Sequence, residues 1–296
     1  MTSSPPRGLL PPPIIAHAGP LLENYDVLFC DVWGVVHDGV RAYPGATDAL
    51  LRFRARGGTV VLVTNAPVPK FRVEAMLEAR HVPPDAYDAI VSSGEIALAH
   101  LSEQAYARVH LIGPRGRDGA FFERVTAANV AVADAEAVVC TGLVDDVNET
   151  VETYKPLLEE ARARDLPFVC ANPDLVVDVG GRLFLCAGAL ADAYVHMGGT
   201  VFWAGKPHAS AYRTAKAAAE QIRDAEVRSD RILVIGDAVR TDLAGAQGAG
   251  LDALFIAGGI HRHETISGDK LEPEKLARLF PAGTPGALAA MPALAW

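Results

Sequence analysis

The sequence predicts an α/β protein built around a parallel, doubly wound sheet, and two observations support this fold class. Short apolar runs rich in Val, Ile and Leu alternate along the chain with longer helix-like segments. Such runs are typical of strands that are buried on both faces, as in a parallel sheet covered by helices. The middle of the chain interrupts the alternation with strand and helix signals of its own, which indicates a second domain.

The expected strands and helices follow one another in a regular order. The first pair is the strand Val27–Asp31 and the helix Ala46–Gly58, which ends at two glycines. The later elements are the strand Thr59–Asn65, the helix Phe71–Arg80, the strand Ala89–Ser93, the helix Glu95–Leu101, and, near the far end, the strands Arg231–Asp237 and Asp252–Ala257. Pro207 is expected in the first turn of a further helix.

The break in the middle of the chain divides the expected domains. Residues 104–200 carry their own strands and a long helix and are interpreted as an inserted α/β domain. Residues 1–103 and 201–296 then form one interrupted core domain.

Composition and charge exclude some classes of partner. The chain has 296 residues, of which 50% are hydrophobic and 21% charged, so it has enough material for a sizeable core. A net charge of −9 argues against nucleic acid or an anionic membrane as the main partner, while a local phosphate site stays compatible with it. No apolar run reaches the roughly 18–20 residues that a membrane-spanning helix needs.

The four cysteines indicate a reducing compartment. None of them forms a CxxC pair, and no secretory segment is evident, so we expect a cytoplasmic protein. The cysteines themselves are expected to be small core residues.

Polar side chains gather at the expected carboxyl ends of the strands, which is where open parallel sheets bind ligands. Asp31 follows the first strand, Thr64 and Asn65 end the second, and Asp237 follows a later one, with Asp242 five residues on. The segment GKPH adds Lys206, which lies between a glycine and a proline.

Two acids, a hydroxyl, an amide and an ammonium group at one sheet edge predict a site for phosphate and a divalent metal. Mg²⁺ prefers oxygen ligands and commonly takes one or two carboxylates together with substrate phosphate. Lys206 and Thr64 would bind phosphoryl oxygens, and Asp31 would attack phosphorus. Taken singly, each residue has an ordinary alternative: Asp237 as a helix cap, Lys206 as a surface side chain.

The order of these residues resembles the haloacid dehalogenase (HAD) superfamily. The forms VTN, GKP and GDxxxTD, together with YPGA, are similar to its class IIA branch, which includes sugar-phosphate, 4-nitrophenyl phosphate and pyridoxal phosphate phosphatases. The resemblance covers residues from about 25 to 260. It implies a Rossmann-like core with an α/β cap inserted after the second motif.

The resemblance also implies a role for each residue. Asp31 would be the nucleophile and a metal ligand, Asp237 and Asp242 would complete the metal site, and Lys206 and Thr64 would hold the phosphate. Asn65, beside Thr64, is counted with the catalytic residues. Asn172 and Asp174, in the segment ANPD, would belong to the cap and line its inner face, although a plain turn is an equal alternative. Caps of this branch often pair, so a homodimer through the cap is one expected assembly.

Position 33 departs from the pattern of the family's phosphatases. They usually carry a second Asp there, whose carbonyl binds the metal and whose side chain protonates the leaving group. The carbonyl of Trp33 can still bind the metal, but an indole N–H is a donor without useful acidity. General acid catalysis contributes about 10²–10⁴-fold, so an alkyl phosphate would react slowly without it.

Several alternatives follow from Trp33. The enzyme acts slowly or on activated phosphates, or a nearby group such as His37 or Asp38 supplies the proton, or the site binds a ligand without turnover. Trp33 is either a stacking platform for a substrate or a hydrophobic plug, and His37 either reaches the substrate or is an ordinary loop residue. Dehalogenases of the superfamily also place an aromatic residue after the nucleophile, but they need no metal and lack GDxxxTD.

The sequence therefore predicts a cytoplasmic, Mg²⁺-dependent hydrolase of the HAD type. Its expected substrate is a small phosphorylated metabolite such as a sugar phosphate. A non-catalytic relative that binds a phosphate ligand is the main alternative.

Overall fold

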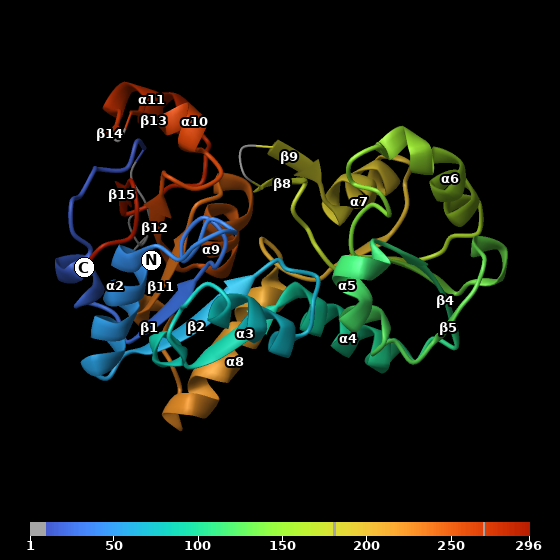
Figure 1. Ribbon diagram of the computed structural model, residues 1–296, viewed down its shortest axis with the longest axis horizontal. Coiled ribbons are helices and arrows are strands. Elements are labelled where there is room, and N and C mark those ends of the chain that lie inside the picture. The colour runs from blue at the N-terminus through green and yellow to red at the C-terminus, as the bar shows by residue number, and fades with distance from the viewer. Residues whose placement is uncertain (1–9, 180–181, 269) are drawn as a thin grey trace, which may run out of the picture. The chain divides into compact units, whose positions relative to one another are not determined.

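The first of two compact units is built on a six-stranded sheet with the order β15-β12-β11-β1-β2-β3 (Figure 1). The computed structural model describes residues 10–179, 182–268 and 270–296, and the described residues within 1–64, 75–91 and 212–296 form this unit. β1 pairs in parallel with β2 and β11, and β12 pairs in parallel with β11 and β15. The strands are β1 Val27–Cys30, β2 Thr59–Thr64, β3 Ala89–Ser92, β11 Ile232–Gly236, β12 Asp252–Ile256 and β15 Ala289–Met291. The predicted parallel α/β core is thus confirmed.

The central strands of this sheet are buried along their whole length. Every residue of β1, β2 and β11 is buried, which is what their unbroken apolar sequences VLFC, TVVLVT and ILVIG predict for strands covered on both faces. Polar residues lie at their carboxyl ends: Thr64 is the last residue of β2, and Asp31, Asn65 and Asp237 directly follow β1, β2 and β11.

Helices follow the strands of this unit. The helix after β1, α2 (Pro44–Ala55), begins with a proline in its first turn and ends before Gly57, whose φ of +89° a side chain would strain. The other helices are α1 Gly19–Leu22, α9 Ala244–Ala249, α10 Arg262–Thr265 and α11 Pro273–Leu279, with the linking helices α3 Lys70–Glu78 and α8 Ala209–Arg223. Short 3₁₀ turns cover Pro84–Ala86 and Ser229–Arg231, a π-helical turn covers Val239–Leu243, and β13 Ile266–Ser267 pairs with β14 Lys270–Leu271.

The second unit consists of residues 65–74 and 92–211 and has a parallel sheet of its own, with the order β10-β7-β6-β4-β5. Its strands are β4 Arg108–Ile112, β5 Ala128–Asn129, β6 Ala137–Cys140, β7 Phe168–Cys170 and β10 Val201–Trp203. Its helices are α4 Ser93–Gln104, α5 Arg115–Phe122, α6 Lys155–Ala163 and α7 Ala187–His196, with 3₁₀ turns at Val132–Asp134 and Val151–Tyr154. β8 Val176–Val179 and β9 Arg182–Leu185 form an antiparallel ribbon.

The second unit includes the expected insertion of residues 104–200 and more. Helix α4 and strand β10 also belong to it, because β10 pairs with β7 in the smaller sheet. The expectation for Pro207 is wrong: α8 begins at Ala209, so Pro207 lies in the turn that precedes the helix.

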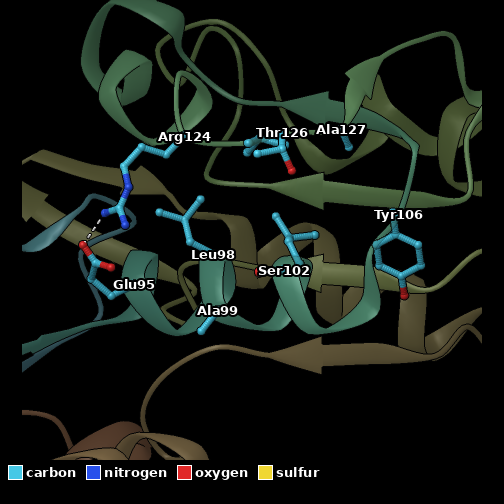
Figure 2. Close-up of a pocket in the computed structure, with 10 residues that line it drawn as sticks. Glu95, Leu98, Ala99, Ser102, Tyr106, Arg124, Thr126 and Ala127 are labelled. Atoms are coloured by element: carbon cyan, nitrogen blue, oxygen red, sulfur yellow. Dashed lines mark hydrogen bonds and ion pairs between the residues drawn. The ribbon is translucent and has the colours of Figure 1, made fainter.

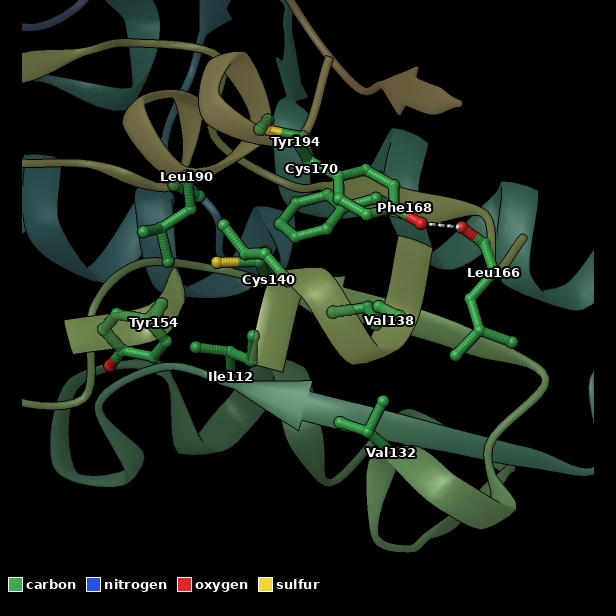
Figure 3. Close-up of a cluster of buried hydrophobic side chains, with 14 of the residues drawn as sticks. Ile112, Val132, Val138, Cys140, Tyr154, Leu166, Phe168, Cys170, Leu190 and Tyr194 are labelled. Carbon is green, nitrogen blue, oxygen red and sulfur yellow. Dashed lines mark hydrogen bonds between the residues drawn. The ribbon is translucent and has the colours of Figure 1, made fainter. Parts of the chain in front are cut away.

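The core of the second unit is packed around two aromatic rings (Figure 3). The ring centroids of Phe168 and Tyr194 lie 5.5 Å apart, and both side chains are fully buried. The Tyr194 hydroxyl donates a hydrogen bond to the Leu166 carbonyl over 2.6 Å. An aromatic ring with one polar end fits such a core only when the hydroxyl has a partner.

The cysteines are core residues, as predicted. All four thiols are free and buried, and Cys140 and Cys170 belong to the cluster around Phe168. Burial raises the pKa of the Cys140 thiol to about 12, so this thiol stays protonated at neutral pH.

A cavity of about 300 Å³ lies in the second unit between α4 and the segment 124–127 (Figure 2). The ion pair between Glu95 and Arg124 lies at one end of it and Tyr106 at the other. Of the described residues that line this cavity, none is a predicted site residue.

Across the residues that the structure describes, no helix combines the length and the apolar character needed to cross a membrane.

The Tyr194 hydroxyl gives a stability prediction. Replacing Tyr194 by Phe should lower the free energy of unfolding by about 1–3 kcal/mol, because the Leu166 carbonyl loses its buried donor. Tyr106→Phe is the matched control, since within the described chain its partly exposed hydroxyl makes no recorded hydrogen bond. Urea denaturation of both variants measures the difference, and equal effects would contradict the assignment.

Candidate active site

Two acidic residues emerge side by side from the edge of the larger sheet. β1 and β11 are parallel neighbours in which Cys30 lies opposite Ile235, so Asp31 and Asp237 both follow directly at the carboxyl edge. The Asp31 N–H continues the ladder by donating to the Ile235 carbonyl over 2.8 Å. Topology therefore brings together two residues that are separated by 206 positions (237 − 31) in the chain.

Asp242 joins this pair through the π-helical turn after β11. The N–H of Asp242 donates to the Ala238 carbonyl over 3.0 Å, while the Ala238 N–H donates back to Asp242 Oδ2 over 3.1 Å. The turn thereby directs a residue five positions after Asp237 back to the strand end. A carboxylate oxygen from each of Asp31, Asp237 and Asp242 lies within 4.8 Å of the others.

This trio fits a divalent cation. Its donors are all carboxylate oxygens, the ligand type of hard cations such as Mg²⁺. Asp237 and Asp242 are 4% and 1% exposed, so their charges are largely removed from water, whereas Asp31 is only partly buried. A bound cation would strongly stabilise three negative charges that lie so close together and are so poorly solvated.

Three glycines leave room for the carboxylates. A Cβ at Gly34 or at Gly259 would lie 1.9 Å from Asp237 Oδ2, and a Cβ at Gly236 would lie 2.1 Å from Asp242 Cγ. The Ile260 N–H then donates to Asp237 Oδ2 over 2.6 Å. The position of Asp237 is thus fixed by the loop after β1 on one side and the loop after β12 on the other.

Trp33 fills the loop after β1. Its ring lies edge-on to the His37 ring, with centroids 5.2 Å apart, and a Cβ at Gly39 would come within 2.5 Å of the indole Cζ2. Gly39 has a φ of +90°, so both its backbone and its missing side chain suit the indole. These contacts favour the plug among the two roles expected for Trp33.

Of the two roles left open for His37, the structure favours that of a loop residue. His37 is fully buried, and its Nδ1 accepts a hydrogen bond from the Gly39 N–H over 3.0 Å, while its Nε2 has no partner among the described residues. Burial, with Arg80 adding a smaller effect, lowers the pKa of His37 to about 4. The imidazole is therefore neutral at pH 7 and holds the loop; neither the predicted substrate contact nor the proton-donor role fits a residue without exposed surface.

Asp38 is also unsuited to replace the missing acid. Its Oδ1 accepts hydrogen bonds from the N–H groups of Val40 and Arg41 over 2.9 and 2.8 Å. Partial burial raises the pKa of Asp38, but these N–H groups and the Arg41 guanidinium outweigh it and hold the pKa below its ordinary value. Asp38 is therefore an ionised turn cap.

The proposed phosphate-binding residues divide between the two units. Thr64, 7% exposed, ends β2 beside β1 in the first unit, at the same edge as Asp31. In the second unit Asn65 forms two hydrogen bonds with the Lys206 backbone: its Oδ1 accepts from the Lys206 N–H over 2.9 Å, and its Nδ2 donates to the Lys206 carbonyl over 3.1 Å. Lys206 itself is 3% exposed.

These bonds favour a positioning role for Asn65, and the catalytic role predicted for it stays a prediction. Its second amide N–H donates to Asp174 Oδ1 over 2.9 Å, so both donors are used within the protein. Gly205 has a φ of +141°, and a Cβ there would lie 2.5 Å from Asn65 Oδ1. Asn65 is therefore a positioning residue that fixes the GKP loop.

Asn172 and Asp174 support the same loop. Asn172 Oδ1 accepts from the Asp174 N–H over 3.1 Å, and Asp174 in turn accepts from Asn65. These bonds lie within the second unit, and the predicted contact of Asn172 and Asp174 with substrate stays a prediction.

Sequence reasoning missed the loop after β12. Gly259, Ile260 and His261 form one wall around Asp237, yet this segment contains no motif and lies well beyond the GDxxxTD form. The sequence offers only a weak indication of this loop: two glycines after an apolar strand, followed within two residues by a histidine.

The glycine wall gives a prediction for metal binding. Gly259→Ala should weaken the affinity for Mg²⁺ by about 10–100-fold, because the new Cβ must displace the Asp237 carboxylate. Gly248→Ala, in α9, is the control, since nothing lies within 4 Å of its added Cβ. Calorimetric titration of both variants measures the affinities, and unchanged binding by Gly259→Ala would show that Asp237 is not a ligand.

Buried His37 gives a prediction for stability against pH. The folded state keeps this imidazole neutral down to about pH 4, whereas the unfolded chain binds the proton near pH 6.5. The unfolded state then holds more protons in this window, so the free energy of unfolding should fall as the pH decreases through it, by up to about 3 kcal/mol.

His37→Asn isolates this contribution because the Asn oxygen can still accept from the Gly39 N–H but does not titrate. Urea denaturation between pH 7 and pH 4 should therefore give a shallower decline for the variant. Parallel curves would contradict the burial of a neutral His37.

Comparison with known proteins agrees with this arrangement of motifs. A family model described as haloacid dehalogenase-like hydrolase matches residues 28–127, and one described as HAD-hydrolase-like matches residues 203–280. The ribonucleotide monophosphatase NagD of Escherichia coli K12 is 26% identical over 253 residues, which cover 83% of this chain and 93% of NagD.

Solved structures extend the comparison over nearly the whole chain. A "possible sugar phosphatase" from Cytophaga hutchinsonii shares the fold with a TM-score of 0.74 at 18% identity, covering 96% of this chain and 99% of that one. A haloacid dehalogenase-like hydrolase from Brucella suis is 42% identical, with a TM-score of 0.83, and the match covers 95% of this chain and 100% of that one. With this relative and the predicted motifs in place, the chain belongs to the haloacid dehalogenase-like hydrolase family.

Proposed function

We propose that this protein is a Mg²⁺-dependent phosphatase that hydrolyses a small phosphorylated metabolite through a phosphorylated Asp31. The asymmetry of the acidic trio carries the proposal. Asp237 and Asp242 are buried and accept backbone hydrogen bonds, while Asp31 is partly exposed at the strand end. Two carboxylates thus have the character of fixed ligands, and the third can meet a substrate.

The residues for the metal follow from the fit of the trio. Asp31, Asp237 and Asp242 would hold the ion, with the Trp33 carbonyl as the fourth protein ligand that the family resemblance implies. When bound, Mg²⁺ neutralises part of the charge on the phosphoryl oxygens.

The chain's own groups perform the displacement. An Asp31 carboxylate oxygen attacks phosphorus, and the bond between phosphorus and the leaving oxygen breaks. The Thr64 hydroxyl and the Lys206 ammonium bind phosphoryl oxygens, and Asn65 holds the Lys206 backbone in place. Water then hydrolyses the acyl phosphate and restores Asp31.

The leaving oxygen sets the main chemical demand. The alkoxide of a sugar is a poor leaving group, and protonating it is worth about 10²–10⁴-fold, or roughly 3–5 kcal/mol of barrier. Trp33, His37 and Asp38 are all unable to give that proton, for the reasons described above. The proton must therefore come from another loop, or the substrate must leave without one.

Names of the relatives point to the substrate class. NagD is named for ribonucleotide monophosphates and the Cytophaga protein for sugar phosphates, so a small phosphate monoester of this kind is the proposed substrate. Four free, buried thiols are compatible with the proposed cytoplasmic location. Homodimerisation through the second unit stays a prediction.

Asp31→Asn tests the proposal. This change removes the nucleophile and keeps the shape of the side chain, so Mg²⁺-dependent release of nitrophenolate from 4-nitrophenyl phosphate should fall to background. Thermal unfolding serves as the control for an intact fold. If the unchanged chain binds inorganic phosphate but hydrolyses no ester, it is a binding protein and the proposal is wrong.

A further inference from the structure

The loop after β12 places an oriented histidine beside the acidic trio. The Ile260 N–H binds Asp237 Oδ2, and the next residue is His261, which precedes the short helix α10. The His261 Nε2 accepts a hydrogen bond from the Val239 N–H, two residues after Asp237. His261 therefore lies in the loop after β12 and is hydrogen-bonded to the turn that follows Asp237.

A carboxylate fixes the orientation and tautomer of this ring. Glu264 Oε1 lies 2.7 Å from His261 Nδ1. In the neutral ring Nδ1 therefore carries the proton, and this N–H donates a hydrogen bond to Glu264. Nε2 is then the basic nitrogen. A histidine whose Nδ1 is held by a carboxylate and whose Nε2 lone pair points away from it is the usual arrangement of a proton-transfer residue.

The contact at Nε2 is weak enough to be exchanged. Val239 N and His261 Nε2 are 3.5 Å apart, at the outer limit for a hydrogen bond. The side chain is also 20% exposed, in contrast to the fully buried His37. A water molecule or a substrate oxygen can thus reach Nε2 at the cost of one weak bond.

We propose that His261, oriented by Glu264, transfers the protons that the family's acid would otherwise transfer at position 33. This role rests on the proposed phosphatase function. It assigns the catalytic proton to the loop after β12, across Asp237 from the loop that carries Trp33.

The proton balance closes over the two steps. In the first, the bond from Asp31 to phosphorus forms, the bond to the leaving oxygen breaks, and that oxygen takes the Nε2 proton of the His261 imidazolium. In the second, a water oxygen bonds to phosphorus, the bond from Asp31 breaks, and the water proton passes to Nε2. His261 returns to its starting state, and no further reactant is needed.

His261→Gln tests the role on two esters. With glycerol phosphate, whose leaving alkoxide is basic, kcat should fall by about 10²–10⁴-fold. With 4-nitrophenyl phosphate the first step needs no acid, but the second still needs a base, so the variant should release a burst of one nitrophenolate per site and then turn over slowly. Mass spectrometry should find the phosphoryl group on Asp31 during the slow phase.

Three further variants distinguish proton transfer by His261 from a purely structural role. Added imidazole should restore part of the activity of His261→Ala, because the small base can occupy the vacated space, whereas it should do nothing for Asp31→Asn. The double variant Trp33→Asp with His261→Gln should regain alkyl phosphate hydrolysis, since Asp at position 33 supplies the acid. Glu264→Gln, a change at an exposed side chain, should give a smaller loss of kcat with little change in KM.

His263→Gln is the matched control, because His263 is an exposed histidine two residues further on, in helix α10. Calorimetric titration with Mg²⁺ checks that His261→Gln leaves the metal site intact. The role is overturned if His261→Gln keeps full activity on both esters without a burst, or if its loss of activity follows a loss of Mg²⁺ affinity. If the unchanged chain hydrolyses neither ester, the phosphatase proposal itself fails and this role fails with it.

Discussion

The site depends on holding three carboxylates together where two of them are shielded from water. Two like charges separated by 4.8 Å repel each other by about 3–4 kcal/mol at an effective dielectric constant near 20. The fold offsets part of this by directing the N–H groups of Ala238 and Ile260 at the acids. Glycines at positions 34, 236 and 259 also leave room for the carboxylates, because a Cβ at any of these positions would displace Asp237 or Asp242. A cation bound by the three acids would balance what remains of the repulsion, so the local backbone is organised for charge rather than for packing.

The loop after β1 shows how the same backbone accommodates a large aromatic residue. The indole of Trp33 lies against Gly39 and the His37 ring, and Arg80 donates from Nε and Nη2 to the Gly39 carbonyl, over 3.0 and 2.6 Å. The polar groups of this loop are thus used to hold the loop itself. His37 and Asp38 are the residues nearest to Trp33 that could transfer a proton. Both are unsuited to it, because their side chains hold the loop that packs around the indole.

The core fold and the acidic trio could be predicted because they follow from local rules. Buried apolar strands predict a parallel sheet, and Asp31 and Asp237 follow such strands directly, so they must meet at one edge. Burial and hydrogen bonding within loops cannot be inferred in this way. The positioning role of Asn65 was not foreseen because nothing in the sequence reveals that both its amide hydrogens are used by Lys206 and Asp174. His261 was missed because its importance comes from strand order, and it belongs to no motif.

Strand order also explains why a proton donor on the far loop is chemically reasonable. β11 lies between β1 and β12, so the loops after β1 and β12 enclose Asp237 from opposite sides, as the contacts of Gly34 and Gly259 with its carboxylate demonstrate. A residue on either loop is therefore adjacent to the reacting centre, although the two loops are more than 200 residues apart in the chain. Losing the acid at position 33 need not abolish proton transfer, because the loop after β12 also borders Asp237. Catalytic capacity in this arrangement is a property of the strand edge as a whole, and an altered first motif alone does not establish that turnover is lost.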